Sequence, residues 1–111
     1  MAKKILKPWG YEEIIELNKY YCLKKLFMKK NHRCSLQYHN KKIETIIVVR
    51  GKLKVIIKNK IKIFKQGDIF TIRPKTVHRM EAIKGNCTYL ESSSVHLKDV
   101  IRLQDDYFRK K

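Results

Sequence analysis

The chain contains little proline or glycine, no long apolar run and no paired cysteines. Two prolines and four glycines in 111 residues leave no linker or low-complexity segment, so we expect one domain over residues 1–111. No apolar run approaches the roughly 20 residues that span a bilayer. No apolar segment follows the basic residues near the start, so we expect no secretory signal and no membrane span. Three cysteines without C-x-x-C spacing favour reduced thiols and a cytoplasmic protein over a disulfide scaffold.

Acidic residues are also scarce, since 27 lysines and arginines face 10 aspartates and glutamates, for a formal charge of +17. Such a charge is typical of proteins that bind nucleic acid. The lysines, however, are spread along almost the whole chain, and many alternate with apolar residues, as in Lys60-Ile61-Lys62-Ile63. That alternation places them on the solvent face of strands. We therefore expect a solvated, lysine-rich surface that attracts anionic substrates such as sugar phosphates, and no nucleic-acid partner.

Helical periodicity is almost absent, and short segments rich in β-branched residues alternate with turn signals. We expect strands at 11–17, 20–28, 35–39, 44–49, 52–58, 61–64, 68–73, 78–83 and 87–93. We expect turns at 18–19, 59–60, 65–68 and 84–86, and a bend at Gly51. Only the tail, 97–109, could hold a helical turn. Many short strands at regular spacing predict an all-β sandwich or barrel.

Four side chains in the middle of the chain form a possible ligand set for a divalent metal: Gln37, His39, Glu44 and His78. Gln37 and His39 are two apart, so on one strand they face the same side. Glu44 opens the next expected strand, and a closed barrel can bring His78 to the same cavity. A single histidine at a strand end is usually only hydrogen-bonded. The joint spacing favours a metal site with positions open for water or substrate.

The same residues resemble the two sequence motifs of the cupin superfamily. The first block reads Gln37-x-His39-x4-Glu44-x6-Gly51, with Gln37 in place of the usual first histidine. The second reads Gly67-x5-Arg73-x-Lys75-x2-His78-x3-Ala82, with Pro74 one position later than usual. The resemblance implies a single-domain cupin β-barrel, a double-stranded β-helix or jelly roll, with the four ligands holding one divalent ion. Zinc is the first expectation for that ion, with manganese or iron as alternatives.

Three further segments resemble the type II mannose-6-phosphate isomerase family, whose cupin domain is also found fused to mannose-1-phosphate guanylyltransferases. These segments are Lys7-Pro8-Trp9-Gly10-Tyr11-Glu12, Ser35-Leu36-Gln37-x-His39, and the closing block from Asp99 to Arg109. The closing block has Phe108 where the family usually has glycine. The segment 91–98 is shorter than in typical isomerases.

This resemblance implies conversion of mannose 6-phosphate to fructose 6-phosphate through an enediolate that a metal stabilises. Arg102 is the expected catalytic and substrate-binding cation, although an ion pair with Asp99 or Asp105 is the alternative. Lys42 could contact a phosphate, or it could be one more solvated lysine. The sequence leaves the general base open between Glu91 and His96.

Two further histidines and two aromatic residues are expected to have no part in catalysis. We expect His32 and His96 to be ordinary loop residues, and Trp9 and Tyr11 to pack and seal the barrel.

By analogy with cupins, which often pair through edge strands, we expect a homodimer. The alternatives to an isomerase are an accessory cupin that binds a sugar phosphate or nucleotide sugar without turnover, and a cupin of other chemistry such as an oxygenase or epimerase.

Overall fold

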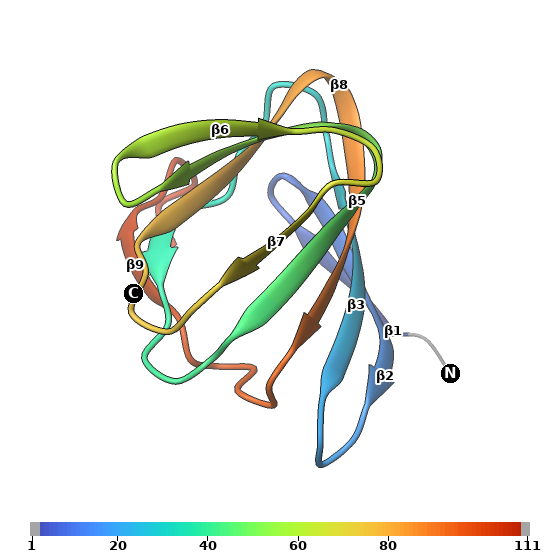
Figure 1. Cartoon of the computed structure of the whole chain (residues 1–111), viewed down its shortest axis with the longest axis vertical. Coiled ribbons are helices and arrows are strands. Elements are labelled where there is room, and N and C mark those ends of the chain that lie inside the picture. The colour runs from blue at the N-terminus through green and yellow to red at the C-terminus, as the bar shows by residue number, and fades with distance from the viewer. Residues whose placement is uncertain (1–2, 110–111) are drawn as a thin grey trace.

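Nine antiparallel strands form one continuous curled sheet in the computed structural model, which describes residues 3–109. They are β1 (Lys3–Lys7), β2 (Gly10–Leu17), β3 (Cys22–Met28), β4 (Leu36–Tyr38), β5 (Glu44–Ile57), β6 (Lys60–Phe64), β7 (Ile69–Ile72), β8 (His78–Ser93) and β9 (Ile101–Gln104). Figure 1 shows β1 to β3 together on one side of the molecule and β4 beside β9 on the other. Between them the sheet curls into a barrel.

The two longest strands, β5 and β8, form the backbone of this barrel. They pair along their length, from Glu44 opposite Ser93 to Ile57 opposite His78. One half of β8 also pairs with β3, and its first residue, His78, pairs with Gln37 of β4. The pairing therefore sets the start of β8 beside β4, while the start of β5 lies opposite the far end of β8. The curl of the sheet brings the side chains at these two strand starts into one interior.

The burial pattern follows the two-residue period of strands. In β5, Ile46 and Val48 are buried and then, after a register shift, Leu53 and Val55 are buried. The shift lies at Gly51, because Arg50 pairs with Thr88 while Lys52 pairs with Ile83. The bulge bends both strands and keeps apolar residues on the inner face on both sides of it. The inner face carries the core, which includes Trp9, Met28, Ile72, Met80 and Tyr89.

The all-β prediction is confirmed, and the expected strands are present with boundaries shifted by a few residues. Two local expectations are wrong. Within the described residues the tail 97–109 holds no helical turn, because β9 pairs with β4 and takes up an extended backbone. The turn expected at 84–86 does not end a strand. Lys84 and Gly85 have positive φ, and β8 absorbs this segment as the bulge opposite Gly51.

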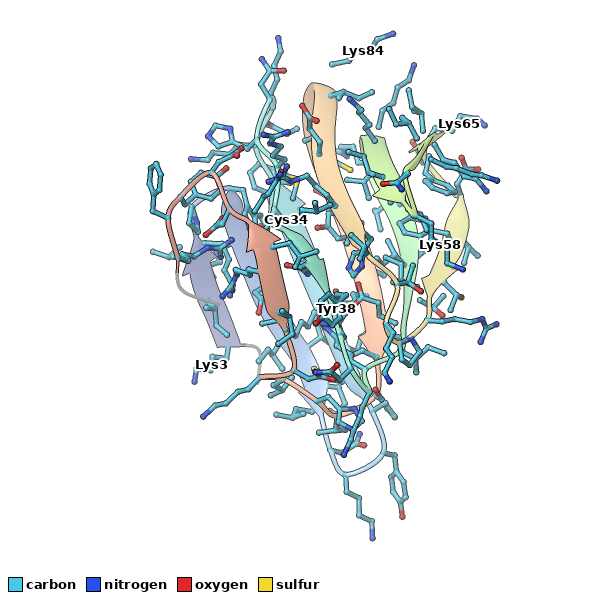
Figure 2. All side chains as sticks on the ribbon, turned by 90° about the vertical axis from the view of Figure 1, so that its left-hand side faces the viewer. Lys3, Cys34, Tyr38, Lys58, Lys65 and Lys84 are labelled. Carbon is cyan, nitrogen blue, oxygen red and sulfur yellow. The ribbon has the colours of Figure 1, made fainter. Side chains whose placement is uncertain are left out.

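The lysine-rich surface has the scattered distribution expected from the sequence. Figure 2 shows Lys3, Lys65 and Lys84 at the margins of the molecule, and all three are exposed. The three cysteines are free and buried, in agreement with the expectation of reduced thiols. Among residues 3–109, no helix has the length and apolar character needed to cross a bilayer.

Candidate metal centre

The predicted ligands come from three elements that the curled sheet brings together. Gln37 lies on β4, with His39 just beyond its end, while Glu44 is the first residue of β5 and His78 the first of β8. Gln37 pairs with His78 on one side and with Arg102 of β9 on the other. Gln37, His78 and Arg102, which are far apart in the sequence, are therefore neighbours in the sheet.

Three of these side chains converge. One potential ligand atom from each of His39, Glu44 and His78 lies within 4.8 Å of the other two. Their exposed fractions are 3%, 2% and 0%, so all three groups are removed from solvent. Two imidazoles and one carboxylate form a ligand set suited to zinc, manganese or iron, with coordination positions left open.

Backbone carbonyls fix the orientation of both imidazole rings. Nδ1 of His39 lies 2.5 Å from the carbonyl oxygen of Asp99, and Nδ1 of His78 lies 2.8 Å from that of Thr76. A carbonyl oxygen only accepts hydrogen bonds, so Nδ1 of each ring carries the proton. In the neutral ring, Nε2 then presents its lone pair. This is the second sphere that metal-binding histidines usually have.

The inward-facing atoms fit a bound cation. Nε2 of His39 and Nε2 of His78 are buried and have no hydrogen-bond partner within residues 3–109. Oε2 of Glu44 is buried as well, and among the described residues its one charged partner besides the imidazoles is Nζ of Lys42 at 3.2 Å. Nε2 of His39 lies 3.2 Å from Oε2 of Glu44. Two ligands about 2.1 Å from one ion, at angles of roughly 90–110°, would be about 3.0–3.4 Å apart. The observed separation matches that geometry, and a cation would satisfy all three atoms.

Gln37 lies at the same cavity but has another partner. Its side chain lines the cavity together with His39 and Glu44. Its Oε1 accepts a hydrogen bond of 2.5 Å from the hydroxyl of Ser35. An amide oxygen has two lone pairs, so this bond leaves one available. The assignment of Gln37 as a fourth ligand stays a prediction.

Lys42 is buried, in contrast to the surface lysines. Its Nζ lies 3.2 Å from Oε2 of Glu44 and 3.0 Å from Oε2 of Glu91. Burial lowers the pKa of Lys42, but the two carboxylates more than offset it and raise the pKa well above its usual value. The ammonium group is therefore charged and shared between a predicted ligand and a second carboxylate. The prediction that Lys42 contacts a phosphate remains open.

The pKa values of the two carboxylates beside Lys42, Glu44 and Glu91, are shifted in opposite directions. Burial raises the pKa of Glu44, but His39 and Lys42 more than compensate and hold it at about 2. Burial also raises the pKa of Glu91, and there the nearby charge of Glu44 adds to the effect. Glu44 is thus kept ionised as a ligand requires, whereas Glu91 is the more basic of the two.

Cations gather at the same cavity, which has a volume of about 120 Å³. Lys7, Arg102 and Arg109 line it together with Lys24 and Lys42. Burial lowers the pKa of Arg102, and the positive charge of Arg109 lowers it further. Arg109 also forms a two-point ion pair with Asp105, at 2.8 and 3.1 Å. Sequence reasoning selected Arg102 but missed Lys7, because β1 was not expected.

Asp99 is another residue whose role the sequence did not indicate. Its carboxylate accepts hydrogen bonds from the backbone N–H groups of Asn40, Lys41 and Lys42, at 2.7 to 3.0 Å. Its carbonyl oxygen is the partner of the His39 ring. Asp99 therefore fixes the loop between β4 and β5 from both sides. The only available signal was its position in the closing block.

The remaining histidine and tryptophan assignments agree with the structure. His32 and His96 lie in loops, where their Nδ1 atoms contact the carbonyl oxygen of Lys30 and the hydroxyl of Ser94. Trp9 is 4% exposed and belongs to the core.

Comparison with known proteins places this chain in a family. A family described as mannose-6-phosphate isomerase C-terminal matches residues 1–105. The chain belongs to this family. Mannose-1-phosphate guanylyltransferase ManC of Salmonella typhimurium is 26% identical to it over 113 residues, covering 98% of this chain and 24% of that protein. This mannose-6-phosphate isomerase C-terminal domain thus spans about a quarter of the length of the curated relatives it matches.

Solved structures show the fold of the domain. A RmlC-like cupin from Shewanella frigidimarina matches 87% of this chain with 86% of its own, at a TM-score of 0.77 and 16% identity. Oxalate decarboxylase from Bacillus subtilis matches 92% of this chain with 30% of its own, at a TM-score of 0.81 and 16% identity. The expected cupin β-barrel is confirmed.

Proposed function

We propose that the protein is a metal-dependent isomerase of a phosphorylated aldose, with mannose 6-phosphate as the first substrate to test. The observation that carries this proposal is the convergence of His39, Glu44 and His78, with three buried ligand atoms directed at one point. Family membership supports the sugar class. The Salmonella relative is a mannose-1-phosphate guanylyltransferase by name, which agrees with that class.

In this proposal His39, Glu44 and His78 hold the ion, and Gln37 is its fourth ligand. Zinc is the first choice, with manganese or iron as alternatives. A bound divalent ion would polarise the sugar carbonyl and stabilise the negative charge that develops during isomerisation. The walls of the cavity, including the buried side chains of Trp9 and Tyr89, exclude water from that charge.

We assign recognition of the phosphate to the cations of the cavity. Lys7, Arg102 and Arg109 come from β1, β9 and the tail, and all three line it. The positive charges of these three side chains repel one another in the cavity, and an anion bound between them offsets this repulsion. Guanidinium groups also bind phosphate oxygens through paired hydrogen bonds. Arg102 keeps the role expected from sequence, while the two carboxylate partners of Lys42 favour an internal position for that lysine.

The deciding experiment is a coupled isomerase assay on protein stripped of metal and reloaded with zinc, manganese or ferrous iron. We expect conversion of mannose 6-phosphate to fructose 6-phosphate in at least one metal form, and none after chelation or in His78→Ala. Equal turnover by stripped and loaded protein would contradict the metal mechanism. A panel of other hexose phosphates then defines the preferred sugar.

A second function is favoured by one observation, namely that the chain matches only about a quarter or less of the length of each of these guanylyltransferase relatives. The domain would then bind a sugar phosphate or nucleotide sugar as an accessory module, without isomerising it. Calorimetry with mannose 6-phosphate, mannose 1-phosphate and GDP-mannose separates the two functions. Binding without turnover in any metal form supports the accessory function.

We also propose that the protein is a cytoplasmic homodimer. The free thiols support the compartment. Among the described strands, β1 pairs only with β2 and β6 only with β5, which leaves one edge of each open. Leu6, Ile61 and Ile63 are exposed on these two strands, at 80%, 61% and 58%. Sedimentation equilibrium that gives the mass of one chain would contradict the dimer.

A further inference from the structure

Glu91 is a buried carboxylate that lines the cavity of the metal centre and is not one of the proposed metal ligands. It lies on β8, is 5% exposed and lines the same cavity as His39 and Glu44. Its Oε2 is 3.0 Å from Nζ of Lys42, which is itself 3.2 Å from Oε2 of Glu44. Lys42 therefore links Glu91 directly to a predicted metal ligand.

A buried ion pair of this kind is expensive as a purely structural element. Taking both charges out of water costs several kcal/mol each, and apolar replacements are often at least as stable. Buried titratable groups beside a charged partner in a cleft are more often found where chemistry takes place. Burial and the charge of Glu44 raise the pKa of Glu91, which makes it a better proton acceptor than an ordinary glutamate.

The other carboxylates of the cavity already have different tasks. Four line it: Glu12, Glu44, Glu91 and Asp99. Glu44 is a predicted ligand, and the carboxylate of Asp99 accepts three backbone N–H groups. Glu12 is paired with Lys24 at 3.3 Å on the β2–β3 side of the cavity. Among these four carboxylates, Glu91 is connected to the predicted ligand Glu44 through Lys42, which contacts both.

We propose that Glu91 is the proton-transfer residue of the isomerisation, with Lys42 as the positioning residue that holds its carboxylate beside the reacting carbons. This inference rests on the proposed isomerase function. It names a base that the sequence alone left undecided between Glu91 and His96. His96 lies in a loop and is hydrogen-bonded to Ser94, and it is not among the residues that line the cavity.

The step conserves atoms and electrons without a second reactant. Glu91 takes the proton from C2 of the open-chain aldose, and the C2–H electron pair forms the C1–C2 double bond of an enediolate. The carbonyl electron pair moves onto O1. The protonated Glu91 then returns the proton to C1, while the hydroxyl proton of O2 passes to O1 and C2 becomes the ketone. Lys42 keeps its proton and offsets the charge of the carboxylate.

The test compares wild type, Glu91→Gln and Glu81→Gln on mannose 6-phosphate carrying deuterium at C2. Glutamine keeps the size of the side chain but cannot accept the proton. In zinc-loaded Glu91→Gln we expect kcat to fall by about 10²- to 10⁴-fold. Zinc affinity and the calorimetric Kd for the sugar phosphate stay near the wild-type values, and deuterium stays on C2. Glu81→Gln, which changes a carboxylate on the same strand that lies outside the cavity, 3.9 Å from Lys54, keeps wild-type turnover.

The outcomes separate this inference from the proposed function. If wild type shows no turnover in any metal form, the isomerase proposal fails and takes the role of Glu91 with it. If wild type is active and Glu91→Gln turns over at a similar rate, the function stands and the base is another group. A loss of turnover that only follows a loss of zinc also overturns the inference.

A second variant covers the case in which Glu91→Gln does not fold. Glu91→Asp keeps the charge and the ion pair with Lys42 but withdraws the carboxylate by one methylene. Misplacing a catalytic group by about 1 Å can cost on the order of 10²-fold in rate. We expect that loss in kcat with an unchanged Kd for the sugar phosphate. Unchanged kcat in this variant overturns the inference.

Discussion

Nε2 of His39 lies 3.2 Å from Oε2 of Glu44 inside the barrel, while Nδ1 of the same ring is bound to the carbonyl oxygen of Asp99. In the neutral ring these two atoms both present lone pairs, and two acceptors at that distance repel each other. A proton on the ring or a metal ion between the two groups turns the repulsion into attraction. His78 adds a third buried acceptor to the same point, which one proton cannot satisfy.

Zinc should therefore bind one site per chain and stabilise the fold. At free zinc a hundredfold above its Kd, the free energy of unfolding should rise by about 2.7 kcal/mol. For a domain of this size that corresponds to a rise in Tm of roughly 10 °C or more. Differential scanning calorimetry with and without zinc measures it. His78→Ala should abolish the rise, because the site loses one of its two imidazoles.

The matched control is His96→Ala, which removes a loop histidine outside the cavity. It should keep the full zinc-dependent rise in Tm. If His78→Ala retains the rise, or if His96→Ala loses it, zinc binds elsewhere on the chain and the assigned centre is wrong.

Asp99 should control the affinity of the site without touching the ion. Its side chain holds the β4–β5 loop through three backbone N–H groups, and its carbonyl orients His39. Loss of such an outer contact typically costs 10- to 100-fold in metal affinity. We expect about this loss for Asp99→Ala and a smaller one for Asp99→Asn, whose amide oxygen still accepts. Competition with a chromophoric chelator measures both.

Asp68→Ala provides the comparison for Asp99→Ala. Asp68 also accepts a backbone N–H, from Lys65 at 2.8 Å, but in a turn that carries no predicted ligand. Its replacement should lower stability and leave zinc affinity unchanged. An equal loss of affinity in the two variants would indicate a general loosening of the fold instead of a local effect on His39.

The fold and three members of the site could be predicted because they leave local signals. Strands show alternating burial, and His39, Glu44 and His78 have the spacing of a recurring motif; the curl of the sheet brings one ligand atom of each to within 4.8 Å of the others. Turn chemistry was also informative at Gly51, where the predicted bend is a bulge in β5. These features depend on residues close in sequence or on a recurring motif.

The missed features depend on partners that are distant in the chain. β1 is basic and largely exposed, and it is a strand only because it pairs with β2. The tail is extended because β4 offers it an edge. Lys42 resembles the other lysines in sequence, and its burial depends on Glu91, which arrives on β8. Local patterns carry no information on such pairings.

The tight bulge at Gly51 should make this glycine irreplaceable, and Gly67 provides a control with the same backbone angle. Both have φ of 88°, so alanine is strained to a similar extent at either position. A Cβ at Gly51 would overlap the backbone carbonyl oxygen of Asn86, whereas a Cβ at Gly67 meets no atom within 4 Å. Gly51→Ala should therefore lose about 1–3 kcal/mol more than Gly67→Ala in urea denaturation. Equal losses would show that β8 moves away without cost.

The ion pair between Arg33 and Asp106 should make stability depend on pH in the acid range. Arg33 binds Asp106 through two hydrogen bonds, of 2.6 and 3.0 Å. These bonds lower the pKa of Asp106 below its ordinary 3.8, with Arg79 adding to the effect. Because the folded pKa is the lower one, the contribution is fully present above the unfolded value. It is lost as the pH falls from about 4 through the folded pKa.

Asp106→Asn should therefore be less stable than wild type at pH 6, and the difference should shrink as the pH falls below 4. Thermal unfolding of both proteins across that range measures it. Arg33→Gln removes the main partner, so in that background Asp106→Asn should change stability less and with a weaker pH dependence, the remainder coming from Arg79 at 3.6 Å. A difference that persists at low pH, or that is undiminished in the Arg33→Gln background, would mean that the ion pair with Arg33 is not the source of the effect.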